Sequence, residues 1–314
     1  MNEPSTPEPT GVAPASGAGA RSRELAHLSL NFVLDVAGQG IDGLKTLDSL
    51  LLMAINQANI APLTRNPAAR SRYGALDAAA PDDERRPVSV RAVAASLRLP
   101  YETARRNIRR LEGLGVCVVS EAGVVAPESF MRSEAYLRAL SRCHETLFRL
   151  YLALRARGLL EALPPAHYVE KEPPVRAAAR LMADYLLRTA EAVVGRTGEL
   201  VSGLLLLPLA AAAAAPERGA GAAMSIAELS RRVQVPAETT RRHVAALVEQ
   251  GLCRTAGAGV VLADADFATA DFAGLLRDNA IAVNRMFAGL AERGVVDAWD
   301  KASGLAPERA NGVG

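Results

Sequence analysis

A pattern of 30 residues occurs twice in this chain, 136 positions apart, and it constrains the fold more than any other feature. Val88–Cys117 and Met224–Cys253 align without a gap and are identical at nine positions. The identities include the run Glu-Thr-x-Arg-Arg, at residues 102–106 and 238–242. Since so long an ungapped match is improbable by chance, the chain contains a duplicated unit.

Each copy predicts two short helices joined by a tight turn. In the first copy Ser89 precedes an apolar-periodic helix, Val90–Leu97, and its hydroxyl can cap a free backbone N–H. Pro100 follows the turn and suits the start of a second helix, Tyr101–Leu114, which Gly115 ends. The buried stripe of that second helix, at steps of four and three, is Ala104, Ile108 and Leu111.

Two short strands follow the second helix in each copy. They are expected at Val116–Val119 and Gly123–Ala126 in the first copy, and at Leu252–Thr255 and Gly259–Leu262 in the second. A helix-turn-helix followed by a hairpin is a winged helix, so the sequence predicts two of them. Cys117 and Cys253 stand at the same position after the second helix, where core packing is the expected role.

The first copy, SVRAVAASLRLPYETARRNIRRLEGLGV, resembles the reader head of bacterial winged-helix transcriptional regulators of the GntR, IclR and MarR kind, and so does the second. The resemblance covers Ser89–Phe130 and Ser225–Phe267. In such proteins the second helix enters the major groove of DNA, and its early residues meet base edges. The resemblance implies these DNA-binding residues: Tyr101, Glu102, Thr103, Arg105, Arg106, Arg109, Glu238, Thr239, Arg241 and Arg242.

Charge favours the first copy as the stronger reader. Arg85–Glu112 holds eight Arg and two Glu, a net charge of +6, whereas Met224–Gln250 holds four Arg and three Glu, a net of +1. Arg109 and Arg110 are replaced by alanines in the second copy. Since arginine can bind guanine or phosphate through paired N–H donors, we expect the second helix-turn-helix to contribute less.

The repeat extends beyond the central motif on both sides. The offset of 136 also aligns Tyr136 with Phe272 and Tyr151 with Phe287, on one face of a long closing helix. Upstream, Leu50–Leu52 matches Leu204–Leu206 at an offset of 154, within leading helices that are expected to be buried.

The fold class predicted is therefore mainly α, with two tandem helical domains that each contain a winged helix. The domains are expected at residues 23–162 and 175–298, joined by a Pro-rich linker at 163–174. Residues 1–22 are expected to be a disordered tail and 299–314 a loose one. The connector Leu63–Arg86 should be an exposed loop, partly disordered.

Other function classes find no support in the sequence. It holds no phosphate-binding Walker loop, no Gly-x-Ser-x-Gly, no His-Glu-x-x-His and no paired Cys/His set, so we expect no enzyme, no catalytic residue, no metal and no cofactor. The three cysteines show no disulfide or metal spacing, which suits the cytoplasm. The apolar run Leu204–Ala215 is shorter than the roughly 20 residues of a membrane span.

We therefore expect a sequence-specific, double-stranded-DNA-binding transcriptional regulator that acts as a pseudo-dimer on two half-sites roughly 34–36 Å apart. Two alternatives stay open. One is a winged-helix scaffold that binds proteins and does not read DNA. The other is a regulator whose leading and closing helices enclose a small apolar pocket for an effector. A homodimer also stays open, and no membrane partner is expected.

Overall fold

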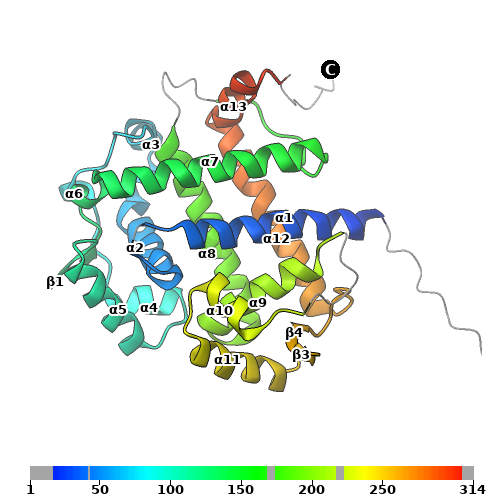
Figure 1. The fold of residues 1–314 in the computed structure, drawn as a ribbon. Helices are drawn as coiled ribbons and strands as arrows, with labels where there is room; N and C mark the ends of the chain where they lie inside the picture. The colour runs from blue at the N-terminus through cyan, green and yellow to red at the C-terminus, as the bar shows by residue number, and fades with distance from the viewer. Residues whose placement is uncertain (1–16, 42, 168–173, 217–222, 306–314) are drawn as a thin grey trace, which may run out of the picture.

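The computed structural model describes residues 17–41, 43–167, 174–216 and 223–305, and it is mainly helical with two small β-hairpins (Figure 1). This confirms the predicted fold class. The first half contains, in order, α1 (Gly17–Gln39), α2 (Thr46–Arg65), α3 (Pro67–Arg72), η1 (Asp82–Glu84), α4 (Val90–Ser96), α5 (Tyr101–Gly113), β1 (Val118–Ser120), β2 (Gly123–Val125), α6 (Glu128–Met131) and α7 (Glu134–Ala156).

The second half repeats the order of the longer elements. It contains α8 (Val175–Thr197), α9 (Leu200–Ala213), α10 (Ile226–Val233), α11 (Ala237–Glu249), β3 (Cys253–Ala256), β4 (Gly259–Leu262), α12 (Ala270–Glu292) and α13 (Val295–Ser303). Each half thus has two leading helices, a helix-turn-helix, a hairpin and a closing helix.

The expected local signals produce these elements. The hydroxyl of Ser89 accepts a hydrogen bond from Ala92 N at 3.1 Å, and that of Ser225 accepts from Glu228 N at 3.1 Å. The stripe of α5 is buried as predicted, and burial raises the pKa of both the Cys117 and the Cys253 thiols to about 12. These cysteines are therefore packing residues in the core.

In each half, the residue just before the helix-turn-helix forms an isolated β-bridge to the second strand of the wing. Val88 bridges to Val124 in the first half, and Met224 bridges to Val260 in the second. A Cβ on Gly123 would lie 2.6 Å from Val88 O, so only glycine allows this approach.

One hydrophobic core joins the two halves. α1 packs against α9 and α12 of the second half as well as against α7, and α8 packs against α2 and α7 of the first half (Figure 1). A buried polar chain crosses the same junction. Tyr185 Oη donates to Asn279 Oδ1 at 2.9 Å, and Asn279 Nδ2 donates to Ser29 Oγ at 2.8 Å.

Parts of both predicted tails are helical, which corrects the sequence-based expectation. Residues 17–22 begin α1, while residues 1–16 lie outside the described residues. Residues 299–303 end α13, because Trp299 packs against the rings of Tyr151 and Phe148, each at 5.4 Å between centroids. Asp300 beside it is buried and accepts a hydrogen bond from Tyr151 Oη at 2.7 Å. Residues 306–314 lie outside the described residues.

The connector between α2 and α4 also differs from the exposed loop that was expected. It contains α3 and η1, and Tyr73, Ala80 and Arg85 within it are buried. The buried Arg85 side chain donates from Nε to Ala80 O at 3.0 Å, and its backbone N donates to Asp82 O at 3.2 Å. The connector is therefore packed onto the helices around it.

The apolar leading helices α2 and α9 are buried, as predicted. Among the described residues no single helix is long and apolar enough to cross a membrane. Only α8 and α9 taken together reach that length, and they are bent by 103° relative to each other.

Candidate nucleic-acid interface

The second helix of each helix-turn-helix presents a polar face outward. In α5, Ala104, Ile108 and Leu111 face the core, which leaves the remaining side chains exposed or half-buried. The same holds in α11, whose inward residues are Thr240, Val244 and Leu247. All ten residues predicted to contact DNA lie on these outer faces, namely Tyr101, Glu102, Thr103, Arg105, Arg106, Arg109, Glu238, Thr239, Arg241 and Arg242.

The turn between the two helices is made in the same way in both halves. Arg98 has a φ of 46° and Gln234 a φ of 57°, and they occupy equivalent positions. Left-handed backbone at a residue other than glycine is uncommon, so the turn geometry is imposed by the packing around it. Both side chains belong to the surface described next, although sequence reasoning did not select them.

The exposed arginines fall into two groups. Arg105 Nε donates to Glu102 Oε2 at 2.9 Å, Arg109 Nη1 donates to Glu112 Oε2 at 2.8 Å, and Arg241 pairs with Glu238. By contrast, Arg106 and its equivalent Arg242 form no hydrogen bond or ion pair with any residue within the described ranges. These two guanidinium groups are free to bind a ligand.

Glu112 links α5 to the first wing. It accepts from Arg109 and also from Val119 N, at 3.1 Å, and these two bonds lower its pKa. The ionised carboxylate therefore ties the end of α5 to β1.

The free arginines line one groove between the two halves, with a volume of about 540 Å³. Thr103 and Arg106 of α5 line it together with their equivalents Thr239 and Arg242 of α11. Figure 1 shows the two helices on the same side of the molecule. The groove is mainly basic, and its other cationic side chains are Lys45, Arg98 and Arg110.

Acidic residues in this groove anchor α5 and α11. Arg110 forms an ion pair with Asp48, whose side chain is 1% exposed and also accepts from Lys45 N at 2.9 Å. In the second half His243 pairs with Glu199, which accepts from Ser202 Oγ at 2.6 Å.

The Arg110–Asp48 pair joins α5 to the start of α2, and the His243–Glu199 pair joins α11 to the start of α9. Arg110 is thus a positioning residue. His243, expected to face the groove or the surface, lines the groove but is only 13% exposed in its side chain.

Gln234 joins the second helix-turn-helix to the first half. Its Oε1 accepts from Thr46 N at 3.0 Å, and its Nε2 donates to Gly38 O at 3.3 Å. Thr46 is the first residue of α2, and Asp48, two residues later, pairs with Arg110 of α5. The start of α2 therefore contacts both α5 and the turn that precedes α11. Their relative position is therefore fixed by specific contacts.

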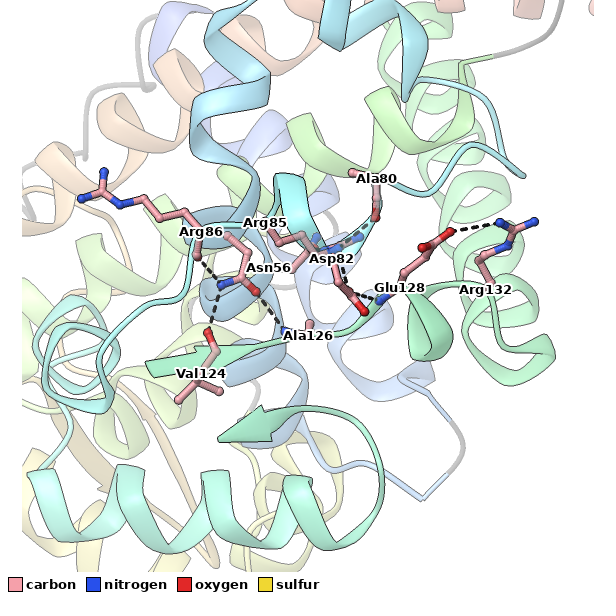
Figure 2. A network of polar contacts seen from close by, with 10 residues as sticks. Asn56, Ala80, Asp82, Arg85, Arg86, Val124, Ala126, Glu128 and Arg132 are labelled. Carbon is pink, nitrogen blue, oxygen red and sulfur yellow. Dashed lines mark hydrogen bonds and ion pairs between the residues drawn. The ribbon is translucent and has the colours of Figure 1, made fainter. Parts of the chain in front are cut away.

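A buried amide fixes the first wing. Asn59 of α2 is fully buried, and its Nδ2 donates to Arg86 O at 2.8 Å and to Val124 O at 3.0 Å. Its Oδ1 accepts from Ala126 N at 2.9 Å. Figure 2 shows Arg86, Val124 and Ala126 gathered at this point. The wing is thereby held to a core helix and does not depend on α5 alone.

Comparison with protein-family models, curated proteins and solved structures found no match to this chain. Within the described ranges, no group of three or more His, Cys, Asp or Glu side chains is arranged to hold a metal ion. A functional assignment thus rests on the residues and geometry of this molecule.

Proposed function

We propose that this chain is a sequence-specific double-stranded-DNA-binding protein that regulates transcription, with α5 as the main reader. The observation that carries the proposal is the pair of free arginines, Arg106 and Arg242, at equivalent positions of two helices that line one basic groove. Arginine binds phosphate through charge-assisted hydrogen bonds, and threonine hydroxyls at a helix start bind it as well.

The two helices have different roles in this proposal. α5 enters the major groove, where Tyr101, Arg105 and Arg109 of its outer face read base edges. α11 carries Ala245 and Ala246 at the positions of Arg109 and Arg110, so it has fewer groups for base reading. Thr239 and Arg242 instead contact the neighbouring phosphates. Contacts from both halves therefore fix the position of the protein along the DNA.

The shared groove also changes the expected target. Two half-sites a full helical turn apart would require reader helices roughly 34–36 Å apart. Here α5 and α11 line the same groove and are linked through the start of α2. The arrangement favours one continuous site over two separated half-sites.

The test selects bound duplexes from a random pool and then measures affinity across salt concentrations. We expect Arg242→Ala to lower the slope of log affinity against log salt by about 0.9 without changing the preferred sequence, because a phosphate contact releases counterions. Arg105→Ala with Arg109→Ala should relax the sequence preference. Arg149→Ala, at an exposed position of α7, is the control and should change neither.

Wild-type binding that does not depend on salt, or that selects no sequence, would contradict the proposal. A protein-binding scaffold is the second candidate, because Leu114 and Val118 are more than half exposed beside the reader helix. For that function Leu114→Lys with Val118→Lys should abolish partner binding, while the arginine variants leave it intact.

A further inference from the structure

A second site lies inside the molecule, away from the reader helices. A partly open cavity of about 100 Å³ is lined by residues of α2 and α7 of the first half, of α8 of the second half and of the connector before α4. Most of its lining is apolar and includes Leu52, Met53, Ile60, Leu140 and Met182. This volume is smaller than the roughly 150 Å³ of an engineered apolar cavity that binds benzene, so only part of a ring or of a short acyl chain fits within it and the rest extends toward the opening.

Three arginines line the same cavity, and their bonded partners are almost all neutral. Arg85 and Arg176 are each 6% exposed, and Arg180 is half-buried. Arg176 donates to Leu76 O at 2.7 Å and to Met131 O at 2.8 Å, while Arg180 donates to Tyr73 O at 2.6 Å. A guanidinium has five N–H donors, so these contacts leave donors unused.

The carboxylates around these arginines do not neutralise them. Within the described ranges, the one carboxylate at ion-pair distance from any of the three is Asp82, with its Oδ1 3.7 Å from Arg85 Nε. Its side chain is 57% exposed, and its Oδ1 also accepts from Glu128 N at 2.6 Å (Figure 2). The interior therefore holds more positive than negative charge.

The burial of these arginines disfavours their charged form and so changes their pKa values. Burial, together with the nearby positive charges of Arg176 and Arg85, lowers the pKa of Arg180 to about 10. Burial also lowers the pKa of Arg85 and Arg176. Buried charges without partners are unfavourable, and an anion placed among them would offset much of that cost.

Two hydroxyl groups at the cavity also lack partners. Ser49 is 5% exposed, and its Oγ is buried without a hydrogen bond. The hydroxyl of Tyr136 forms no hydrogen bond with any described residue, although its ring lies 5.7 Å from the Arg176 guanidinium. Buried polar groups are usually paired, so the buried and unpaired Ser49 Oγ at the cavity wall indicates a place for a polar atom of a ligand, and the half-buried Tyr136 offers a second hydroxyl at the same cavity.

We propose that this cavity binds a small organic anion, a carboxylate attached to a short apolar chain or a single ring. The carboxylate accepts hydrogen bonds from the arginines and from the Ser49 and Tyr136 hydroxyls, and the apolar part fills the space against the leucines and methionines. Binding at this site is independent of the proposed DNA contact.

The test measures thermal shifts and calorimetric affinities of the full chain without DNA. Benzoate and octanoate are the anionic probes, and benzamide and octanamide are their neutral counterparts. We expect at least one carboxylate to raise the melting temperature by an amount that increases with its concentration and affinity, and the matching amide to have little effect. Equal effects of acid and amide, or no effect of either acid, would overturn the proposal.

Variants of the lining residues then test which side chains contact the anion. Arg180→Met keeps most of the apolar stem of the side chain but removes the charged guanidinium, and it should weaken carboxylate binding by about 10- to 100-fold. Ser49→Ala, which changes the fold least, should weaken it by several-fold. Arg188→Met, on the same helix but paired with Asp184, is the control. Unchanged affinity in both Arg180→Met and Ser49→Ala would refute the site, and because no DNA is used, such a result leaves the DNA proposal standing.

Discussion

The arginines of α5 show how a single residue type takes different roles in one helix. Arg105 is paired with an exposed glutamate, Arg106 has no partner among the described residues, and Arg110 is paired with the buried Asp48. The sequence predicted the face that carries them, because the apolar stripe of the helix fixes it. It could not separate their roles, since Asp48 is distant in the chain and no local spacing links it to Arg110.

At this residue scale we predict that Arg110→Ala destabilises the protein more than Arg105→Ala does. Removing Arg110 leaves the carboxylate of Asp48 buried without its cation, although Arg110 is itself 43% exposed and solvent screens part of the effect. The expected loss is about 1–3 kcal/mol, against at most about 0.5 kcal/mol for the exposed pair. Urea unfolding measures both. Equal losses would show that Asp48 does not depend on its partner.

At the scale of elements, the first wing depends on Asn59, which has no equivalent in the second half because Ala213 occupies the matching position. Asn59→Ala would leave Ala126 N without its partner and would remove one bond each from Arg86 O and Val124 O, of which Val124 O keeps its bond from Val88 N. We expect a loss of about 1–3 kcal/mol. Hydrogen exchange should speed up at Ala126 N.

Asn284→Ala is the matched control, because Asn284 is only half-buried and bonds to exposed Glu161. A first wing whose exchange is unchanged in Asn59→Ala would contradict this role of the amide.

The docking of α13 gives a pH prediction. His144 of α7 packs against Trp299, with ring centroids 5.4 Å apart, and burial lowers its pKa below the ordinary value of 6.5. The folded protein therefore favours neutral imidazole, so this stability is present above about pH 6.5 and is lost as the pH falls through the lower folded-state pKa. His144→Phe should remove that part of the pH dependence between about pH 7 and 5.

Unfolding free energies measured at several pH values check this expectation, with the exposed His167→Phe as the control. A wild-type slope that persists in His144→Phe would assign the pH dependence to another group.

The elements that could be predicted from the sequence are those that the repeat describes. Capping serines, apolar periodicity and glycine stops are local signals, so the helices and hairpins of both winged helices were found within a residue or two. α13 was missed because it lies after the end of the repeat and is held by Trp299, whose partners are more than 140 positions earlier. The connector was misread because its charged residues suggest exposure, whereas Arg85 is buried among backbone carbonyls and an amide.

At the scale of the whole molecule, the duplication resembles a dimer built within one chain. α1 lies against the second half and α8 against the first, and one hydrophobic cluster runs through both. The repeat predicts two similar units but not how they pack against each other. Similarity between the halves identifies the residues that the two units share, and it does not identify which residues of one half contact the other. The basic groove and the cavity that we propose to bind an anion both lie at this junction, so both proposed sites depend on it.

The shared core predicts that the two halves unfold together. Trp299 is the single tryptophan of the chain and belongs to the second half, but its ring contacts α7 of the first. Its fluorescence therefore reports on the junction, while far-ultraviolet circular dichroism reports on helices throughout. We expect the two signals to change at the same urea concentration, because loss of the junction would expose apolar surface in both halves at once. A separate, earlier fluorescence transition with helices retained would show instead that each half is stable without the other, as in a chain of independent domains.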